Sequence, residues 1–133
     1  MKTASNRVGK LEVSSILIAD ADEEAASRLA KYFAAKGFRI STARGGEEAL
    51  HLAERESPSV AIIDVALSDM PGDLLASKLR QSQPAIHVLM TTGDYRPEVE
   101  VRARQVGILL YAHKPTDYRL LEAVVAKALE DPR

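Results

Sequence analysis

Short apolar runs alternate with amphipathic segments along most of the chain. The run Val60–Asp64 places four apolar residues in a row before a carboxylate. An uninterrupted run of this kind is typical of a strand that is buried on both faces, as at the centre of a parallel sheet. The pattern predicts four further strands, over residues 15–19, 38–43, 86–90 and 108–112.

Segments with apolar residues at helical spacing follow each of these runs. The first begins after Asp22, which we interpret as its N-cap, and ends at Gly37. The next begins at Gly45–Gly46, a third ends before Pro84, a fourth runs from Pro97 to about Val106, and the last begins at a Thr116 or Asp117 cap. Strands that alternate with helices predict an α/β fold, with a doubly wound five-stranded parallel sheet and five helices.

Length and composition narrow the class of protein. The 133 residues suit one domain, predicted over residues 15–131 after a polar lead-in at 1–14. Basic and acidic residues nearly balance at 18 and 19, so nothing favours nucleic acid as a partner. The absence of cysteine excludes disulfides and thiol nucleophiles. No apolar run approaches the ~20 residues of a membrane span, and no secretory signal is visible, so a cytoplasmic protein without membrane contact is expected.

The residues that end the strands carry the candidate chemistry. The first strand ends in Asp20, the third in Asp64, the fourth in Thr92, and the fifth is followed by Lys114. The carboxyl ends of parallel strands share one edge of a sheet, so these four side chains are expected to gather there. Carboxylates suit Mg²⁺, whereas an ammonium and a hydroxyl suit phosphoryl oxygens.

These residues, with their neighbours, resemble the receiver domain of bacterial response regulators over about residues 15–130. The matching features are Asp20 after Ile-Leu-Ile-Ala, Asp64 after Val-Ala-Ile-Ile, Gly72 eight positions later, Thr92 after Val-Leu-Met-Thr, and Lys114–Pro115 after Tyr111-Ala-His. The resemblance implies a flavodoxin-like sheet of order 2-1-3-4-5. It also implies a protein of two-component signalling or a phosphorelay, rather than an enzyme.

The resemblance assigns roles to the residues that match. Asp64 would accept a phosphoryl group from a histidine kinase or a phosphotransfer protein. Lys114 would contact that group, and Thr92 and Tyr111 would form the pair that switches. Because no room for an output module follows the last helix, a single-domain regulator that signals by partner contact is expected.

The resemblance also implies a Mg²⁺ site formed by Asp20, Asp64 and the backbone carbonyl of Ala66. The family has two adjacent acids at the end of the first strand, but the second position here is Ala21. We therefore expect weak Mg²⁺ binding, unless Asp22 leaves its capping position to compensate.

Two other functions fit some of the same residues. Ala21 favours a degenerate receiver that binds partners without phosphorylation. Asp20 and Asp22 also form the Asp-x-Asp pattern of a haloacid-dehalogenase-like phosphotransferase, in which Asp20 would be the nucleophile. Finally, Leu120 and Ala123 widen the apolar surface of the last helix, which predicts self-association or partner docking through the fourth and fifth helices.

Overall fold

The computed structural model describes residues 14–130. Apart from Ser14, the predicted lead-in lies outside these residues, as does the predicted end of the domain at residue 131. The strands are β1 (Ser15–Ala19), β2 (Arg39–Ala43), β3 (Val60–Asp64), β4 (His87–Thr92) and β5 (Leu110–His113). The helices are α2 (Glu23–Ala35), α3 (Gly46–Glu56), α4 (Gly72–Ser82), α5 (Pro97–Gln105) and α6 (Tyr118–Glu130). No helix in this part of the chain is long and apolar enough to cross a bilayer.

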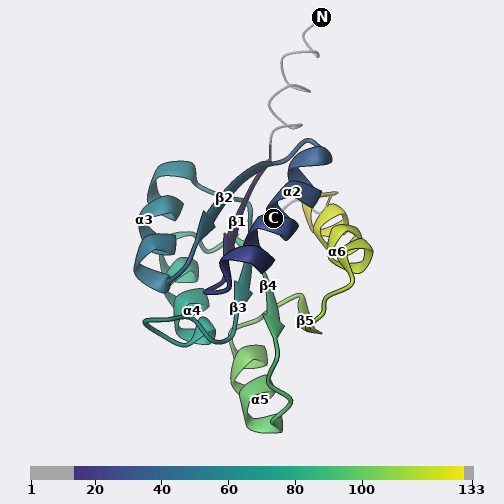
Figure 1. The fold of residues 1–133 in the computed structure, drawn as a ribbon. Helices are drawn as coiled ribbons and strands as arrows, with labels where there is room; N and C mark the ends of the chain where they lie inside the picture. The colour runs from purple at the N-terminus through teal and green to yellow at the C-terminus, as the bar shows by residue number, and fades with distance from the viewer. Residues whose placement is uncertain (1–13, 131–133) are drawn as a thin grey trace, which may run out of the picture.

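All five strands run parallel in a single sheet of order β2-β1-β3-β4-β5, which confirms the predicted fold. Their carboxyl ends point toward the lower edge of the sheet in Figure 1. In the register of the central strands, Ile16 lies opposite Val60, and Asp64 lies opposite Thr91. Each strand therefore delivers the residue that ends it to the same edge.

Helices cover both faces of the sheet, in two layers that Figure 1 shows on either side of the strands. On one face Ile16, Ile18 and Ile62 pack with residues of α2 and α6. On the other face Leu17 and Ile63 pack with residues of α3, α4 and α5. Burial of one such side chain stabilises the fold by about 1.5–3 kcal/mol. Both faces of the central strands are thus covered, as their unbroken apolar runs predict.

Three strands, β2, β4 and β5, have bounds that differ from the predicted ones. β4 continues to Thr92, because Thr91 and Thr92 still pair with Ala112 and His113 of β5. β5 starts only at Leu110, where its pairing with β4 begins. An apolar run marks only the hydrophobic part of a strand, whereas hydroxyl and imidazole side chains extend the paired part without extending the run.

The starts of α2, α3 and α6 follow the predicted residues, and α3 differs from the other two in how its first turn is capped. Asp22 Oδ1 accepts hydrogen bonds from the backbone N–H groups of Glu24 and Ala25, which confirms it as the N-cap of α2. Asp117 caps α6 in the same way. Helix α3 begins at Gly46, and its N-cap is Gly45, which has no side chain to cap the free amides. Its first turn is satisfied from another part of the chain.

Candidate functional site

Three strand ends bring Asp20, Asp64 and Lys114 into direct contact. Lys114 Nζ lies 2.7 Å from Asp20 Oδ2 and 2.5 Å from Asp64 Oδ2. Only 10% of the Asp20 side chain and 9% of the Asp64 side chain is exposed, against 28% for Lys114. Lys114 follows the edge strand β5 and reaches across the end of β4 to the two carboxylates on β1 and β3. The three groups form one charged cluster at the carboxyl edge of the sheet.

Backbone amides fix the orientation of both carboxylates. Asp20 Oδ1 accepts a hydrogen bond from the N–H of Asp22 at 2.9 Å. Asp64 Oδ1 accepts one from the N–H of Ala66 at 2.7 Å. Each carboxylate therefore uses one oxygen for the loop that follows its strand and the other for Lys114. In both residues Oδ2 is the oxygen that faces the Lys114 ammonium.

Close packing holds β3 against the start of α4. A Cβ atom at Gly72 would lie 2.4 Å from the carbonyl oxygen of Asp64. The Gly72 N–H donates a hydrogen bond of 2.8 Å to the carbonyl of Val65. Glycine is required at this position because the backbone of β3 approaches too closely for any side chain.

Burial and the opposite charges determine the ionisation of the cluster. Burial raises the pKa of the Asp20 carboxyl, and the hydrogen bond from Lys114 offsets only part of that effect. Burial lowers the pKa of Lys114, but the hydrogen bonds to Asp20 and Asp64 outweigh it, so the net shift is upward. Lys114 is an ammonium at neutral pH. By formal count, the two carboxylates and this one ammonium give the cluster a charge of −1.

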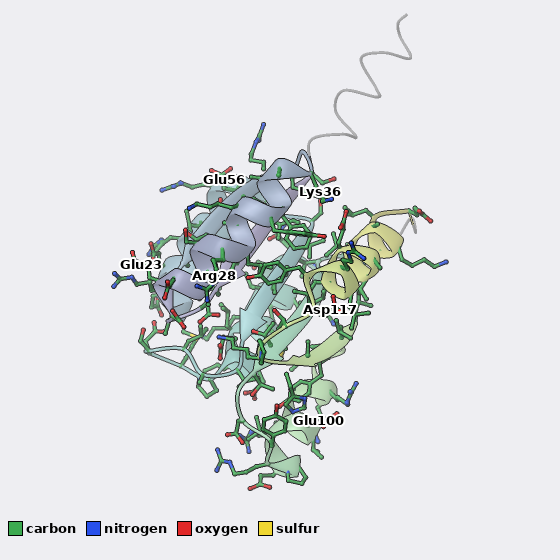
Figure 2. All side chains as sticks on the ribbon, turned by 45° about the vertical axis from the view of Figure 1, so that its right-hand side comes forward. Glu23, Arg28, Lys36, Glu56, Glu100 and Asp117 are labelled. Atoms are coloured by element: carbon green, nitrogen blue, oxygen red, sulfur yellow. The ribbon has the colours of Figure 1, made fainter. Side chains whose placement is uncertain are left out.

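Two hollows give access to Asp20 from opposite sides. One, of about 420 Å³, also contains Asp22, Arg28, Thr91 and Lys114 and lies between α2 and the loop after β5. Figure 2 shows Arg28 projecting from α2 and Asp117 at the start of α6. The other, of about 520 Å³, lies between α2 and β2. The cluster is therefore recessed but open to a partner.

The oxygen donors at the cluster fit a hard cation such as Mg²⁺ in their chemistry. Asp20, Asp64 and the carbonyl of Ala66 supply carboxylate and carbonyl oxygens. The methyl group of Ala21 adds no donor, and Asp22 uses its Oδ1 for the α2 cap. Within residues 14–130, no group of three or more His, Cys, Asp or Glu side chains could hold a metal ion. The set has two acidic donors.

Thr92 lies beside the cluster, but its hydroxyl is directed elsewhere. The residue is fully buried, and its Oγ1 accepts a hydrogen bond of 2.8 Å from the N–H of Asp94. It also donates one of 3.3 Å to the Asp94 carbonyl. Thr91 is the residue that lies opposite Asp64 and lines the hollow. The role of Thr92 toward a phosphoryl group stays a prediction.

Tyr111 belongs to an aromatic group that the sequence only partly indicated. Its ring meets the edge of His113 at 5.6 Å between ring centroids, and His113 stacks on Tyr95 at 4.1 Å. The Tyr111 hydroxyl is buried and has no hydrogen-bond partner. We call Tyr95, His113 and Tyr111 the aromatic stack. Neither Tyr95 nor His113 stood out in the sequence, because a stack between a loop and a strand leaves no periodic signal.

Asp69 is a second residue that sequence reasoning missed. Its Oδ1 accepts a hydrogen bond of 2.7 Å from the N–H of Gly46, and its Oδ2 accepts one of 3.0 Å from the N–H of Glu47. It thus caps α3 from the loop that follows Asp64. The Gly45–Gly46 start of α3 signals a helix that lacks a cap of its own, but nothing in the sequence identifies the residue that supplies it.

Comparison with known proteins gives a consistent family signal. The family model described as the response regulator receiver domain matches residues 16–126. The chain is 32% identical over 114 residues to the photosynthetic apparatus regulatory protein RegA of Cereibacter sphaeroides, covering 85% of this chain and 62% of that protein. It is 30% identical over 118 residues to the regulatory protein AtoC of Escherichia coli, covering 89% of this chain but 26% of that protein. The chain thus spans less than two thirds of these relatives.

Solved structures agree with the sequence comparison. A CheY-like response regulator receiver domain protein from Methanospirillum hungatei superposes with a TM-score of 0.84 at 27% identity, covering 89% of this chain and 94% of that one. The signal receiver domain of an HD domain-containing protein from Pseudomonas fluorescens gives a TM-score of 0.84 at 27% identity, with coverage of 89% and 95%. Each of these two similarities covers 89% of this chain.

Proposed function

The chain belongs to the response-regulator receiver family, and from that premise we propose that Asp64 accepts a phosphoryl group from a histidine kinase or a phosphotransfer protein. The observation that carries the proposal is the contact of Lys114 with both Asp20 and Asp64. An ammonium between two recessed carboxylates is suited to neutralise a transferred phosphoryl group. The ammonium of Lys114 would then bind phosphoryl oxygens in place of a carboxylate oxygen.

The transfer requires few groups from the protein. A carboxylate oxygen of Asp64 attacks the phosphorus of a phosphohistidine, so that a P–O bond forms as the P–N bond breaks. The electron pair of the broken bond returns to the imidazole ring of the donor. The Ala66 N–H holds the other Asp64 oxygen and fixes the direction of attack. Lys114 keeps its proton and donates hydrogen bonds to the phosphoryl oxygens. A Mg²⁺ ion, when bound, neutralises charge on those oxygens.

We expect this site to bind Mg²⁺ with low affinity. Asp20, Asp64 and the Ala66 carbonyl would hold the ion, and water can complete its coordination. Water adds no charge, so the cluster keeps a formal charge of −1, whereas an aspartate in place of Ala21 would make it −2. We expect phosphorylation to need a high Mg²⁺ concentration or the assistance of a partner.

The proposal is tested by locating the phosphoryl group. The protein is incubated with acetyl phosphate and Mg²⁺ and then mapped by mass spectrometry, with Asp64→Asn and Asp20→Asn beside the wild type. We expect modification at Asp64 in the wild type and none in Asp64→Asn. Asp73→Asn, which changes an acid in the first turn of α4, is the matched control and should retain labelling. Modification at Asp20 would favour a phosphotransferase of the haloacid dehalogenase type instead.

A degenerate receiver is the second candidate, and two observations favour it. Ala21 removes an acidic donor, and Lys114 already satisfies one oxygen of each remaining carboxylate. Such a protein would signal by contact alone. It would carry no phosphoryl group at any Mg²⁺ concentration, and its partner binding would be the same in Asp64→Asn.

Contact with partners is expected to involve α5 and α6 in either case. Leu120 on α6 is 45% exposed and Val101 on α5 is 55% exposed. Apolar side chains of this size at the surface favour an interface. Self-association or docking through these helices therefore stays part of the proposal.

A further inference from the structure

The loop that follows the acceptor Asp64 is closed at its base. Residues 65–71 leave β3 and return to α4, and an antiparallel bridge pairs Ala66 with Pro71. The hydrogen bond from the Gly72 N–H to the Val65 carbonyl closes the loop from below. Between these points the loop extends to Ser68 and Asp69, both of which are exposed. Its tip is held by a contact outside the loop.

That contact is the first turn of α3. The Asp69 carboxylate accepts hydrogen bonds from two consecutive amides of the helix, at 2.7 Å from Gly46 and 3.0 Å from Glu47. These amides have no partner within the helix, and the helix dipole favours a negative charge there. The N–H of Gly46, followed by that of Glu47, lowers the pKa of the Asp69 carboxyl. Asp69 is therefore ionised at neutral pH.

Glycine at the start of α3 makes this close approach possible. A Cβ atom at Gly45 would lie 2.8 Å from Asp69 Oδ1 and 3.1 Å from Ser68 Oγ. Both distances are shorter than an ordinary van der Waals contact. Gly45 thus accommodates the loop, as well as starting a helix.

We propose that Asp69 is a positioning residue for phosphoryl acceptance at Asp64. By tying the tip of loop 65–71 to α3, it fixes the backbone of Ala66. The N–H of Ala66 orients the Asp64 carboxylate, and the Ala66 carbonyl is the expected third oxygen donor to Mg²⁺. The inference rests on the proposed function of Asp64. It assigns a role in that function to a residue that does not touch the acceptor.

Because this site offers Mg²⁺ fewer acidic ligands than the family pattern, its Mg²⁺ affinity depends more on the position of the Ala66 carbonyl. With Ala21 in place of an acid, the Ala66 carbonyl is one of three expected protein donors. Outer-shell residues that orient metal ligands typically affect metal affinity or activity by about 10–100-fold. Asp69 would act on a metal ligand only through the loop backbone, so we expect its loss to lower Mg²⁺ affinity by roughly tenfold, the lower end of this range.

Three variants separate this role from simple support of α3. Asp69→Ala removes both acceptors, whereas Asp69→Asn keeps one acceptor oxygen for Gly46. Gly45→Ala keeps the carboxylate but displaces the tip of the loop from the opposite side. Glu47→Gln is the control, because it removes one exposed negative charge at the same helix start. Mg²⁺ affinity is read from the Ala66 amide resonance, the labelling rate from acetyl phosphate, and loop opening from hydrogen exchange at Ala66.

Positioning predicts the same changes in Asp69→Ala and Gly45→Ala. Mg²⁺ affinity and labelling rate per folded molecule fall roughly tenfold, exchange at Ala66 accelerates, and Asp69→Asn lies between these variants and the wild type. The Glu47→Gln control stays at wild-type values. If Asp69→Ala lowers only the melting temperature, with unchanged Mg²⁺ affinity and exchange at Ala66, the role is structural and the inference is wrong. Absence of labelling in the wild type would defeat the proposed function alone, since exchange and Mg²⁺ binding would still decide the role of Asp69.

Discussion

The two sides of Asp64 are held in different ways. On the side of α3, loop 65–71 is fixed by hydrogen bonds of Asp69 to two helix amides. On the side of α5, the aromatic stack is held by ring contacts, and the Tyr111 hydroxyl is buried without a partner. Tyr95 at the outer end of the stack is 70% exposed. On the α3 side the Asp69 carboxylate has hydrogen-bond partners, whereas on the α5 side the Tyr111 hydroxyl has none.

This difference indicates which side moves. A buried hydroxyl without a partner costs about 1–3 kcal/mol relative to a satisfied one. The cost falls if another arrangement of the same residues gives the hydroxyl a partner. Thr92 lies between the two regions, with its hydroxyl bonded to the loop before α5. We therefore expect phosphorylation to rearrange the β4–α5 loop and Tyr111, and to leave the start of α3 in place.

The largest effect is expected from truncation of the aromatic stack. Tyr111→Ala should lower the free energy of unfolding by about 3 kcal/mol, because a buried aromatic ring leaves a cavity. Tyr111→Phe should not lower it and should raise it by up to about 1–3 kcal/mol, because the variant removes a buried hydroxyl that has no hydrogen-bond partner. Urea unfolding of both variants measures the difference. A loss above ~1 kcal/mol in Tyr111→Phe would mean that the hydroxyl is bonded in solution, and the contrast between the two sides would fail.

The next effect concerns the cluster between the two sides. Ala21→Asp restores a carboxylate and should tighten Mg²⁺ binding by about tenfold or more, equivalent to ~1.4 kcal/mol. A Mg²⁺ titration followed by amide shifts measures it, with Ala21→Asn as the control that adds an oxygen without charge. Equal affinity in the wild type and Ala21→Asp would show that another oxygen already supplies the missing ligand.

A smaller effect is expected from Asp20→Asn, and it depends on pH. Burial raises the pKa of Asp20 in the folded protein above its value in the unfolded chain. The folded state is therefore favoured when Asp20 is protonated, and that advantage is lost as the pH rises through the folded pKa. Asp20→Asn should be at least as stable as the wild type at pH 7 and equal to it below about pH 4. Thermal unfolding across pH tests this, and a variant less stable at pH 7 would show that the ion pair with Lys114 dominates.

The smallest effect is expected at the surface of α6. Leu120→Glu places a charge on an exposed apolar position and should weaken self-association or partner docking, with a change in stability within about 0.5 kcal/mol. Figure 2 shows Glu100 on α5 and Asp117 at the start of α6. Sedimentation compares the variant with the wild type, and Lys127→Glu on the last turn of α6 is the control. Identical sedimentation and partner binding would exclude this surface as an interface.

The sequence predicted the fold because every element carries its own local signal. Buried runs such as Val60–Ile63, the Asp22 cap and the strand-end acids are read from neighbouring residues alone. Parallel topology then brings Asp20, Asp64 and Lys114 to one edge without further information. These are consequences of periodicity and of the direction of the strands.

The contacts between elements were not predictable in the same way. The cap that Asp69 gives to α3 joins residues 23 positions apart, and any of several acids could have supplied it. The aromatic stack depends on where the β4–α5 loop places Tyr95, and the orientation of the Thr92 hydroxyl depends on the same loop. Loop conformation therefore decides the details that distinguish the two sides of Asp64.

The most direct test of a phosphoryl switch at Asp64 is a titration with beryllofluoride and Mg²⁺, followed by amide resonances across the whole chain. Beryllofluoride mimics a phosphoryl group on the acceptor carboxylate. We expect large shifts from Thr91 to Asp94 and around Tyr111, and small ones at Gly46 and Glu47. Shifts confined to residues 64–72, or equally large at the start of α3, would contradict a switch that is transmitted through the α5 side.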